Sequence, residues 1–134
     1  MVVGTSAVVA VLFNDPDARL YAATLSSAPT RLISAVTRVE LAFVVEERKG
    51  EPGRADLERL LAVGGFEVVA VTPVQAMRAI EAFRRFGRGR HPGSLNIGDC
   101  FAYALAVAME EELLFKGDDI AQTDIPSALP GSSC

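Results

Sequence analysis

The chain begins MVVGTSAVVAVLF (residues 1–13), and this stretch predicts the start of an α/β fold. Met1 to Val3 is a short apolar run of the kind that forms a buried strand. Gly4 ends that run, and the apolar residues up to Phe13 predict a helix after a tight turn. In α/β proteins, ligands bind beyond the carboxyl ends of the strands. Position 4 therefore lies where such a protein usually carries a working side chain, and glycine supplies none.

The alternation of strand and helix signals continues along the chain. We expect further strands near 31–34, 66–71 and 113–115, an edge segment near 127–129, and helices over 6–13, 17–26, 34–49, 52–63, 74–86 and 98–109. Val39 and Phe43 follow the helical period in the third helix, and Met77, Ile80 and Phe83 share one side of the fifth. This order indicates a mostly parallel sheet with helices on both faces.

The composition is typical of an ordinary globular protein. Half of the 134 residues are hydrophobic and 22% are charged, so we expect one domain over 1–129 and a flexible tail over 130–134. The net charge of −4 argues against a protein that simply coats nucleic acid. Cys100 and Cys134 form no disulfide framework or zinc spacing, which fits a reducing, cytoplasmic setting. No run approaches the ~18 apolar residues that span a bilayer, so no membrane is expected among the partners.

Three separate segments place acids at one end of the predicted sheet. Glu40 interrupts an apolar helix face, Asp99 lies in the first turn of a helix, and Asp118-Asp119 follow the last predicted strand. Taken singly, they have ordinary explanations: a surface position for Glu40, the helix dipole for Asp99 and turn chemistry for the pair. Taken together, clustered carboxylates repel one another unless a cation neutralises them. All-oxygen ligands favour Mg²⁺ or Mn²⁺ over zinc, and such ions commonly act on phosphates.

A second feature is the arginine-rich segment RAIEAFRRFGRGRH (residues 78–91). It is either a solvated helix face with a polar loop, or a rim whose guanidinium groups pair with nucleic-acid phosphates. For the second interpretation the binding residues are Arg84, Arg85, Arg88 and Arg90. We expect His91, the sole histidine, to lie at the surface or to face RNA rather than to act as a general base.

Four segments together resemble a known family: VVGTSAVVAVLFNDPDA, SAVTRVELAFVVEER, GRGRHPGSLNIGDCFAYALA and LLFKGDDIAQTDI. In this order and spacing they are similar to the PIN-domain ribonucleases, specifically the VapC-type toxins of bacterial toxin–antitoxin modules. The resemblance implies a three-layer α/β/α sandwich with a mostly parallel sheet. It also implies Mg²⁺- or Mn²⁺-dependent endonuclease action on tRNA, rRNA or mRNA, which inhibits translation. Homodimers neutralised by a VapB-type antitoxin are implied as well.

The resemblance also implies roles for individual residues. Glu40 and Asp99 match the family's second and third acids, and the fourth falls at Asp119 or at its neighbour Asp118. These acids are the implied catalytic groups, with Glu40, Asp99 and Asp119 as metal ligands. The polar residues that match positions around the site are Thr5, Ser6 and Asn96. Gly4 stands where the family pattern has its first metal-binding Asp, so we expect weak metal affinity and little cleavage.

Two alternatives remain open at this point. A PIN-like binding module could have lost catalysis and kept its dimer and its antitoxin groove. A phosphoacceptor receiver domain shares the size, the sheet type and an acidic pocket, but its first strand is followed by paired acids rather than by Gly-Thr-Ser. The sequence offers only candidates for a dimer interface, namely Leu20, Tyr21, Phe43 and Val44.

Overall fold

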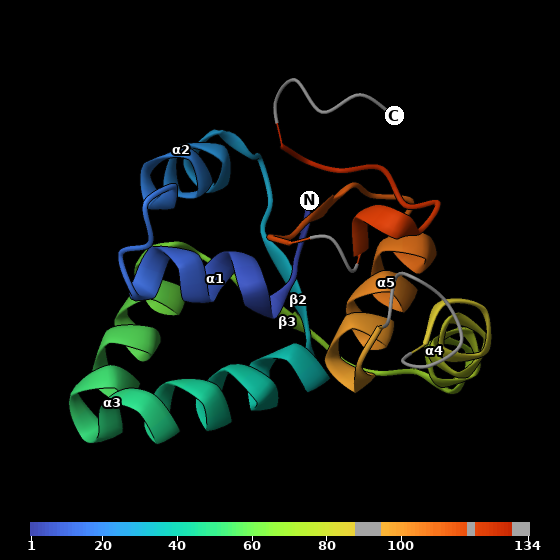
Figure 1. Ribbon diagram of the computed structural model, residues 1–134, viewed down its shortest axis with the longest axis horizontal. Helices are drawn as coiled ribbons and strands as arrows, with labels where there is room; N and C mark the ends of the chain where they lie inside the picture. Colours follow the sequence, from blue (N-terminus) through green and yellow to red (C-terminus); the bar gives the residue numbers. More distant parts are fainter. Residues whose placement is uncertain (88–94, 118–119, 130–134) are drawn as a thin grey trace.

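The computed structural model describes residues 1–87, 95–117 and 120–129 (Figure 1). Its four-stranded parallel sheet has the order β3-β2-β1-β4, with strands β1 (Val2–Val3), β2 (Leu32–Ser34), β3 (Glu67–Val69) and β4 (Leu113–Leu114). The helices are α1 (Thr5–Leu12), α2 (Ala18–Ser27), α3 (Ala35–Val63), α4 (Pro73–Phe86) and α5 (Ile97–Met109), and a 3₁₀ turn, η1, spans Ile120–Gln122. The predicted α/β fold with a parallel sheet is confirmed. Ser127 forms one parallel bridge with Leu113, where the sequence predicts an edge segment.

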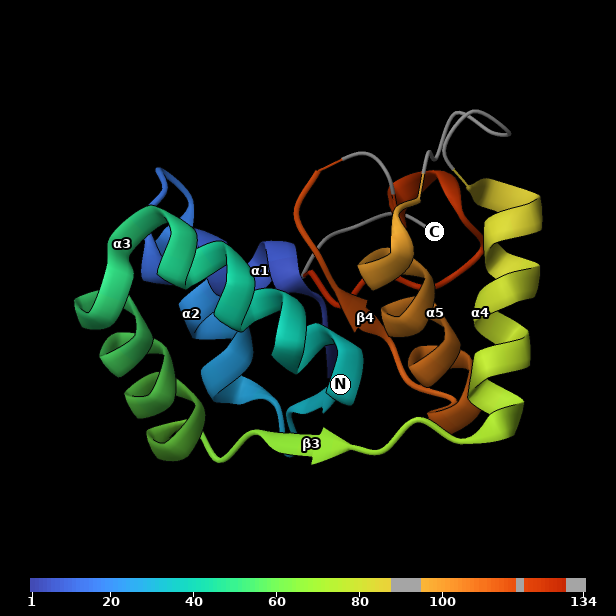
Figure 2. The same ribbon diagram turned by 90° about the horizontal axis from the view of Figure 1, so that it is seen from below.

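The sheet separates two apolar layers, because successive residues of a strand point to opposite faces. Val3 and Ile33 pack into the layer formed with α1, α2 and α3. Val2 and Leu32 pack into the other layer, formed with α4 and α5. Figure 2 shows the two groups of helices on opposite sides of the strands. Because β1 and β2 are buried on both faces, they have no polar face and appear in the sequence as continuous apolar runs.

The two helices predicted over 34–49 and 52–63 form one bent element, α3. The Ser34 side chain accepts a hydrogen bond from the Val36 N–H at 3.2 Å and so caps its start. Gly50 has non-helical angles, φ 60° and ψ −147°, which L side chains rarely adopt. The chain bends there, and Figure 1 shows the second half of α3 turning back toward α2. The bend lets both halves of α3 contribute to the same apolar layer.

The structure corrects the apolar helix sides that the periodicity suggests. Met77 and Ile80 of α4 are 55% and 44% exposed. The buried face of α4 instead carries Ala79, Ala82 and Phe86, and it packs against α5. This helix has two apolar sides. The side with the small residues Ala79 and Ala82 lets the backbones of α4 and α5 approach more closely, so it is the one that is buried. In the described part of the chain, no helix has both the length and the apolar character that a membrane crossing requires.

Candidate active site

A pocket of about 370 Å³ opens where the carboxyl ends of the strands meet α1, α3 and α5. Its lining residues are Thr5, Ser6, Val9, Glu40, Val44, Arg48, Asn96, Asp99, Lys116 and Ile120. The described acids and polar residues that the sequence proposes for the site therefore lie around one space. The topology explains this, because α1 follows β1, α3 follows β2, and Lys116 follows β4 at the same edge of a parallel sheet.

Glu40 is half-buried and its carboxylate is held from two sides. The Thr5 hydroxyl donates a hydrogen bond to Glu40 Oε1. On the other side lies Gly98 in the first turn of α5, where a Cβ atom would overlap the Glu40 carboxylate oxygens. Glycine at position 98 thus makes room for the acid, and α3 and α5 meet at this point. The carboxylate that interrupts the apolar pattern of α3 is therefore directed into the pocket.

Asp99 combines a structural contact with its place in the pocket. The Asp99 N–H donates to Asn96 Oδ1 at 2.8 Å, and Asp99 Oδ2 accepts from the Asn96 N–H at 3.1 Å. This reciprocal pair is a capping box that begins α5. The helix-end interpretation and the ligand interpretation are thus compatible, because Asp99 also lines the pocket.

Position 4 has room for a Cβ atom. Gly4 is extended, with φ −86° and ψ 162°, angles that any residue adopts. A Cβ atom there would lie 3.4 Å from the Leu114 carbonyl oxygen and 4.0 Å from the Phe115 Cβ, which is ordinary van der Waals contact. The fold therefore does not require glycine between β1 and Thr5, and an aspartate could occupy the position without backbone strain.

The pocket is also lined by two cationic residues that the sequence did not indicate as site residues, Arg48 and Lys116. Lys116 Nζ lies 3.0 Å from Asp15 Oδ2 and 2.8 Å from Asp17 Oδ1. The hydrogen bond from Lys116 lowers the pKa of the Asp17 carboxyl, and its hydrogen bonds to the two acids raise the pKa of the Lys116 ammonium. The Lys116 N–H also donates to Ser6 Oγ at 2.8 Å. Lys116 thus ties the end of β4 to α1 and to the α1–α2 connection.

The remaining predicted site residues are not among those that line this pocket in the described part of the chain. Asp118, Asp119, Arg88, Arg90 and His91 fall outside the described residues. Arg84 and Arg85 lie in the last turn of α4 and do not line this pocket.

The pocket presents donor atoms of the type that a divalent metal prefers. Among the residues that the structure describes, no three His, Cys, Asp or Glu side chains are grouped closely enough to hold a metal ion by themselves. Glu40, Asp99 and the hydroxyls of Thr5 and Ser6 nevertheless present only oxygen atoms to one space, and this donor chemistry fits a hard cation.

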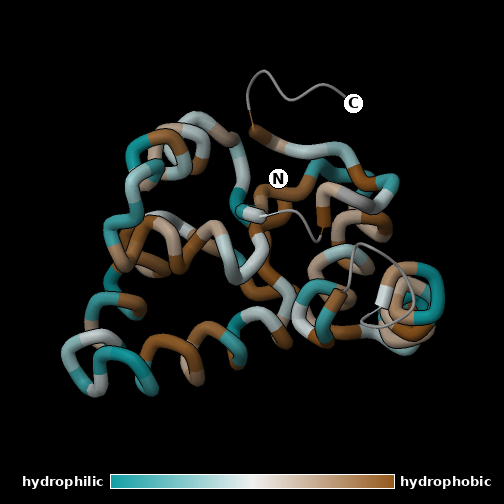
Figure 3. Tube along the Cα trace, viewed as in Figure 1, coloured by the Kyte–Doolittle hydropathy of each residue, from teal (hydrophilic) through white to brown (hydrophobic). Residues whose placement is uncertain are grey.

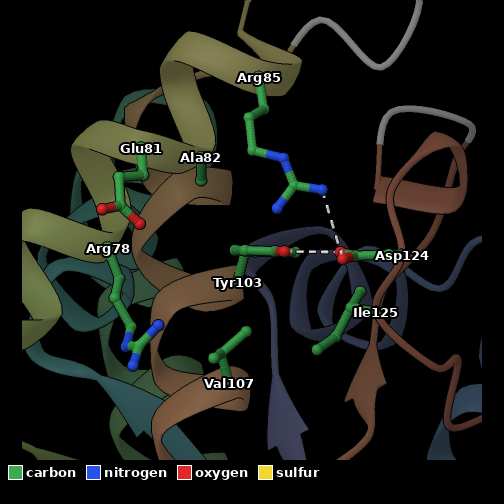
Figure 4. Close-up of a pocket in the computed structure, with 8 residues that line it drawn as sticks. All are labelled: Arg78, Glu81, Ala82, Arg85, Tyr103, Val107, Asp124 and Ile125. Carbon is green, nitrogen blue, oxygen red and sulfur yellow. Dashed lines mark hydrogen bonds and ion pairs between the residues drawn. The ribbon is translucent and has the colours of Figure 1, made fainter.

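A second pocket, of about 280 Å³, lies between α4, α5 and the segment at Asp124 (Figure 4). The Tyr103 hydroxyl donates to Asp124 Oδ1 at 2.5 Å, and the Arg85 guanidinium lies 3.5 Å from Asp124 Oδ2. The hydrogen bond from Tyr103 lowers the pKa of the Asp124 carboxyl, whereas burial raises the pKa of Tyr103 to about 12. These polar groups satisfy one another and fasten the C-terminal segment to the two helices.

Comparison with known proteins identifies the family. Residues 1–126 match the PIN domain family. The chain belongs to the PIN-domain family. Ribonuclease VapC30 of Mycobacterium tuberculosis is 45% identical to it over 131 residues, which cover 97% of this chain and 100% of the relative. The VapC-type resemblance of the four sequence segments is therefore confirmed, and the receiver-domain alternative is excluded.

Solved structures of toxins and toxin–antitoxin complexes share the fold. The crystal structure of Mycobacterium tuberculosis VapC20, described as a Sarcin-Ricin loop cleaving toxin, matches with a TM-score of 0.79 at 16% identity, covering 96% of this chain and 98% of that one. A toxin–antitoxin complex from Klebsiella pneumoniae matches with a TM-score of 0.66 at 19% identity, covering 92% of each chain. At these identities the likeness concerns the fold alone.

Proposed function

We propose that this VapC-type PIN protein is a metal-dependent endoribonuclease toxin. We propose further that glycine at position 4 impairs its activity. The convergence of Glu40, Asp99 and Thr5 around one pocket at the carboxyl edge of the sheet carries this proposal. The ribonuclease name of VapC30 and the PIN-domain match support the class of reaction. The substrate that we propose is tRNA, rRNA or mRNA, whose cleavage would inhibit translation.

Glu40 and Asp99 are the described residues that would hold Mg²⁺ or Mn²⁺, and Asp119 or Asp118 would complete the set. When bound, such an ion supplies Lewis-acid stabilisation of a phosphodiester and helps to activate water. Thr5 orients Glu40 by donating to its Oε1 atom. Asn96 orients Asp99 through the capping box. The hydrogen-bonded pairs limit the rotation of both carboxylates, which preorganises them for a cation.

The missing carboxylate at position 4 is the reason for the expected impairment. Position 4 lies directly before Thr5, and its backbone accepts a side chain. An acid there would add one negative charge next to Thr5, the residue that bonds Glu40, and so improve the neutralisation of a divalent ion. Without it, we expect weak metal affinity and little cleavage.

The test compares the present chain with Gly4→Asp and with Gly4→Asn, which has the same shape as Asp without its charge. Calorimetric titration with Mn²⁺ and cleavage of total bacterial RNA in Mg²⁺ are the measurements. We expect roughly 100-fold more cleavage from Gly4→Asp, and little change from Gly4→Asn. Equal activity in all three proteins would contradict the role of position 4. No cleavage by correctly folded Gly4→Asp would contradict the ribonuclease assignment.

A second candidate function is a binding module that titrates a VapB-type antitoxin without cutting RNA. Glycine at position 4 favours it, because a missing ligand would disable the chemistry while leaving the binding surface intact. Co-expression with the cognate antitoxin separates the two candidates. Co-purification without RNA cleavage by the present chain, and without a gain in Gly4→Asp, would favour the binding module.

We also propose a homodimer formed through an apolar patch on the first half of α3. Figure 3 shows apolar turns along this part of α3. Val39, Phe43 and Ile97 are 51%, 69% and 71% exposed, and they surround one hollow beside Glu40. Of the interface candidates in the sequence, Phe43 belongs to this patch, whereas Tyr21 is only 3% exposed and packs inside. We expect Phe43→Asp to be monomeric by light scattering, with Met77→Asp on α4 as the exposed control.

A further inference from the structure

We infer that Arg48 is a positioning residue that binds an RNA phosphate neighbouring the one that is cut. This inference rests on the proposed ribonuclease function and adds a binding position to it. The pocket is lined by the carboxylates Glu40 and Asp99 and also by Arg48. An extended polyanion would place one phosphate at the acids with their metal and another at the arginine.

The spacing on α3 sets this arrangement. Glu40, Val44 and Arg48 are separated by four residues each, so they lie on one face of the helix, and all three line the pocket. Eight residues of α-helix rise by ~12 Å. The bend at Gly50 comes two residues later, so Arg48 lies in the last turn of the first half of α3. Glu40 and Arg48 therefore mark two ends of one wall.

An aromatic ring supports the Arg48 guanidinium. Its Cζ atom lies 5.0 Å from the centroid of the Phe13 ring, at the end of α1, within the range of a cation–π contact. Holding the guanidinium on a ring restricts its rotamers, and this lowers the entropy lost when it binds a ligand. The planar fork of arginine matches the paired oxygens of a phosphate.

The other cation in the pocket is already engaged. Lys116 is bound by both Asp15 and Asp17. Arg48, in contrast, is exposed and makes no ion pair with an acid within residues 1–87, 95–117 and 120–129. Among the described lining residues, Arg48 is thus the cation that can accept an anionic group without displacing a carboxylate.

The neighbouring residue Lys49 provides a matched control. Lys49 Nζ also lies over the Phe13 ring, 5.4 Å from its centroid, and Lys49 is exposed, but it does not line the pocket. General electrostatic attraction of RNA predicts similar losses for Arg48→Gln and Lys49→Gln. A specific phosphate contact predicts a loss for Arg48→Gln alone.

The experiment uses the Gly4→Asp protein, in which the proposed function predicts measurable cleavage. We expect Arg48→Gln to raise KM about tenfold with kcat unchanged, and to reduce the salt slope of RNA binding by about 1. Arg48→Lys keeps the charge without the planar guanidinium. Its KM should lie between those of the Gly4→Asp protein and its Arg48→Gln variant. Lys49→Gln should change neither quantity. Thermal unfolding checks that each variant is folded.

A scan with neutral methylphosphonate linkages locates the contact. We expect one linkage, away from the scissile one, to weaken binding by Gly4→Asp and to have no further effect in the Arg48→Gln variant. Equal KM values and salt slopes for Arg48→Gln and Lys49→Gln would overturn the inference while leaving the ribonuclease assignment intact. Failure of Gly4→Asp itself to cleave would overturn both.

Discussion

Two of the pockets in the described part of the chain are similar in size and in residue types, yet they are built differently. The pocket beside Glu40 has a volume of about 370 Å³, and the pocket beside Asp124 about 280 Å³. Each contains two acids and two cations. At Asp124 the acid is paired with Arg85 and with the Tyr103 hydroxyl. At Glu40 the partner is a neutral hydroxyl, that of Thr5.

This difference separates a cluster that holds the fold together from the one that we propose to be reactive. The negative charge of a carboxylate that is paired with a cation and a hydroxyl is already largely neutralised inside the fold. A carboxylate held by a neutral donor is oriented but keeps its negative charge available for a metal ion. Charge content alone does not distinguish the pockets, whereas the identity of the hydrogen-bond partner does. The following substitutions test this distinction.

The largest effect is expected from removing the charge of Glu40. In the Gly4→Asp protein, Glu40→Gln should reduce cleavage roughly 100-fold or more while leaving the melting temperature nearly unchanged. Glutamine keeps the shape and an oxygen that can accept from Thr5. The matched change in the other pocket, Asp124→Asn, should lower stability by about 1 kcal/mol and leave cleavage intact. Similar effects of the two substitutions on cleavage would remove the distinction between the pockets.

A smaller effect is expected from Gly98→Ala, which keeps every charge. The added Cβ would overlap the Glu40 carboxylate, so the acid must move. We expect Mn²⁺ affinity in the Gly4→Asp protein to fall about tenfold by calorimetry. Shortening the acid with Glu40→Asp should relieve the overlap and recover part of the affinity. Unchanged affinity in Gly98→Ala would show that the position of this carboxylate is not critical.

Tyr103→Phe should lower the free energy of unfolding by about 1 kcal/mol at pH 7. Its hydroxyl bonds the Asp124 carboxyl and lowers the pKa of that group. The stabilisation is therefore present above the unfolded pKa, about 3.9, and is lost as the pH falls through the lower folded pKa. Urea unfolding at pH 7, 5 and 3 measures this. Tyr21→Phe is the control, because its hydroxyl bonds the neutral Phe115 carbonyl and predicts a loss that does not vary over this range.

The smallest effect concerns the engaged cation of the active-site pocket. Lys116→Gln should raise the pKa of the Asp17 carboxyl toward its ordinary value, since the hydrogen bond from Lys116 is the main cause of the lowering. Titration of the carboxyl carbon by NMR measures the shift, and Arg48→Gln serves as a control that should leave it unchanged. An unaltered Asp17 pKa in Lys116→Gln would mean that the Lys116 contacts do not persist in solution.

The sequence predicted the elements of the fold better than their packing faces. The strands and helices appear near their expected positions, because Gly4, Ser34, Gly50 and Gly98 mark their boundaries in the sequence. Periodicity could not identify the buried side of α4, since Met77 and Ile80 look as apolar as any core residue yet remain exposed. That choice depends on the neighbouring helix α5, whose position arises from contacts distant in the sequence.

For the candidate site, the sequence by itself determined the residue types: carboxylates and hydroxyls at Glu40, Asp99, Thr5 and Ser6, and a glycine at position 4. Only the tertiary structure decided which of these groups meet. Parallel strands bring Thr5 and Glu40 to one edge, α5 begins there with Asp99, and α3 adds Arg48 to the same wall. Residue types are local properties of a chain, and hydrogen-bond partners are not. The pairing of Lys116 with Asp15 and Asp17, about a hundred residues away, exists only once the chain has folded.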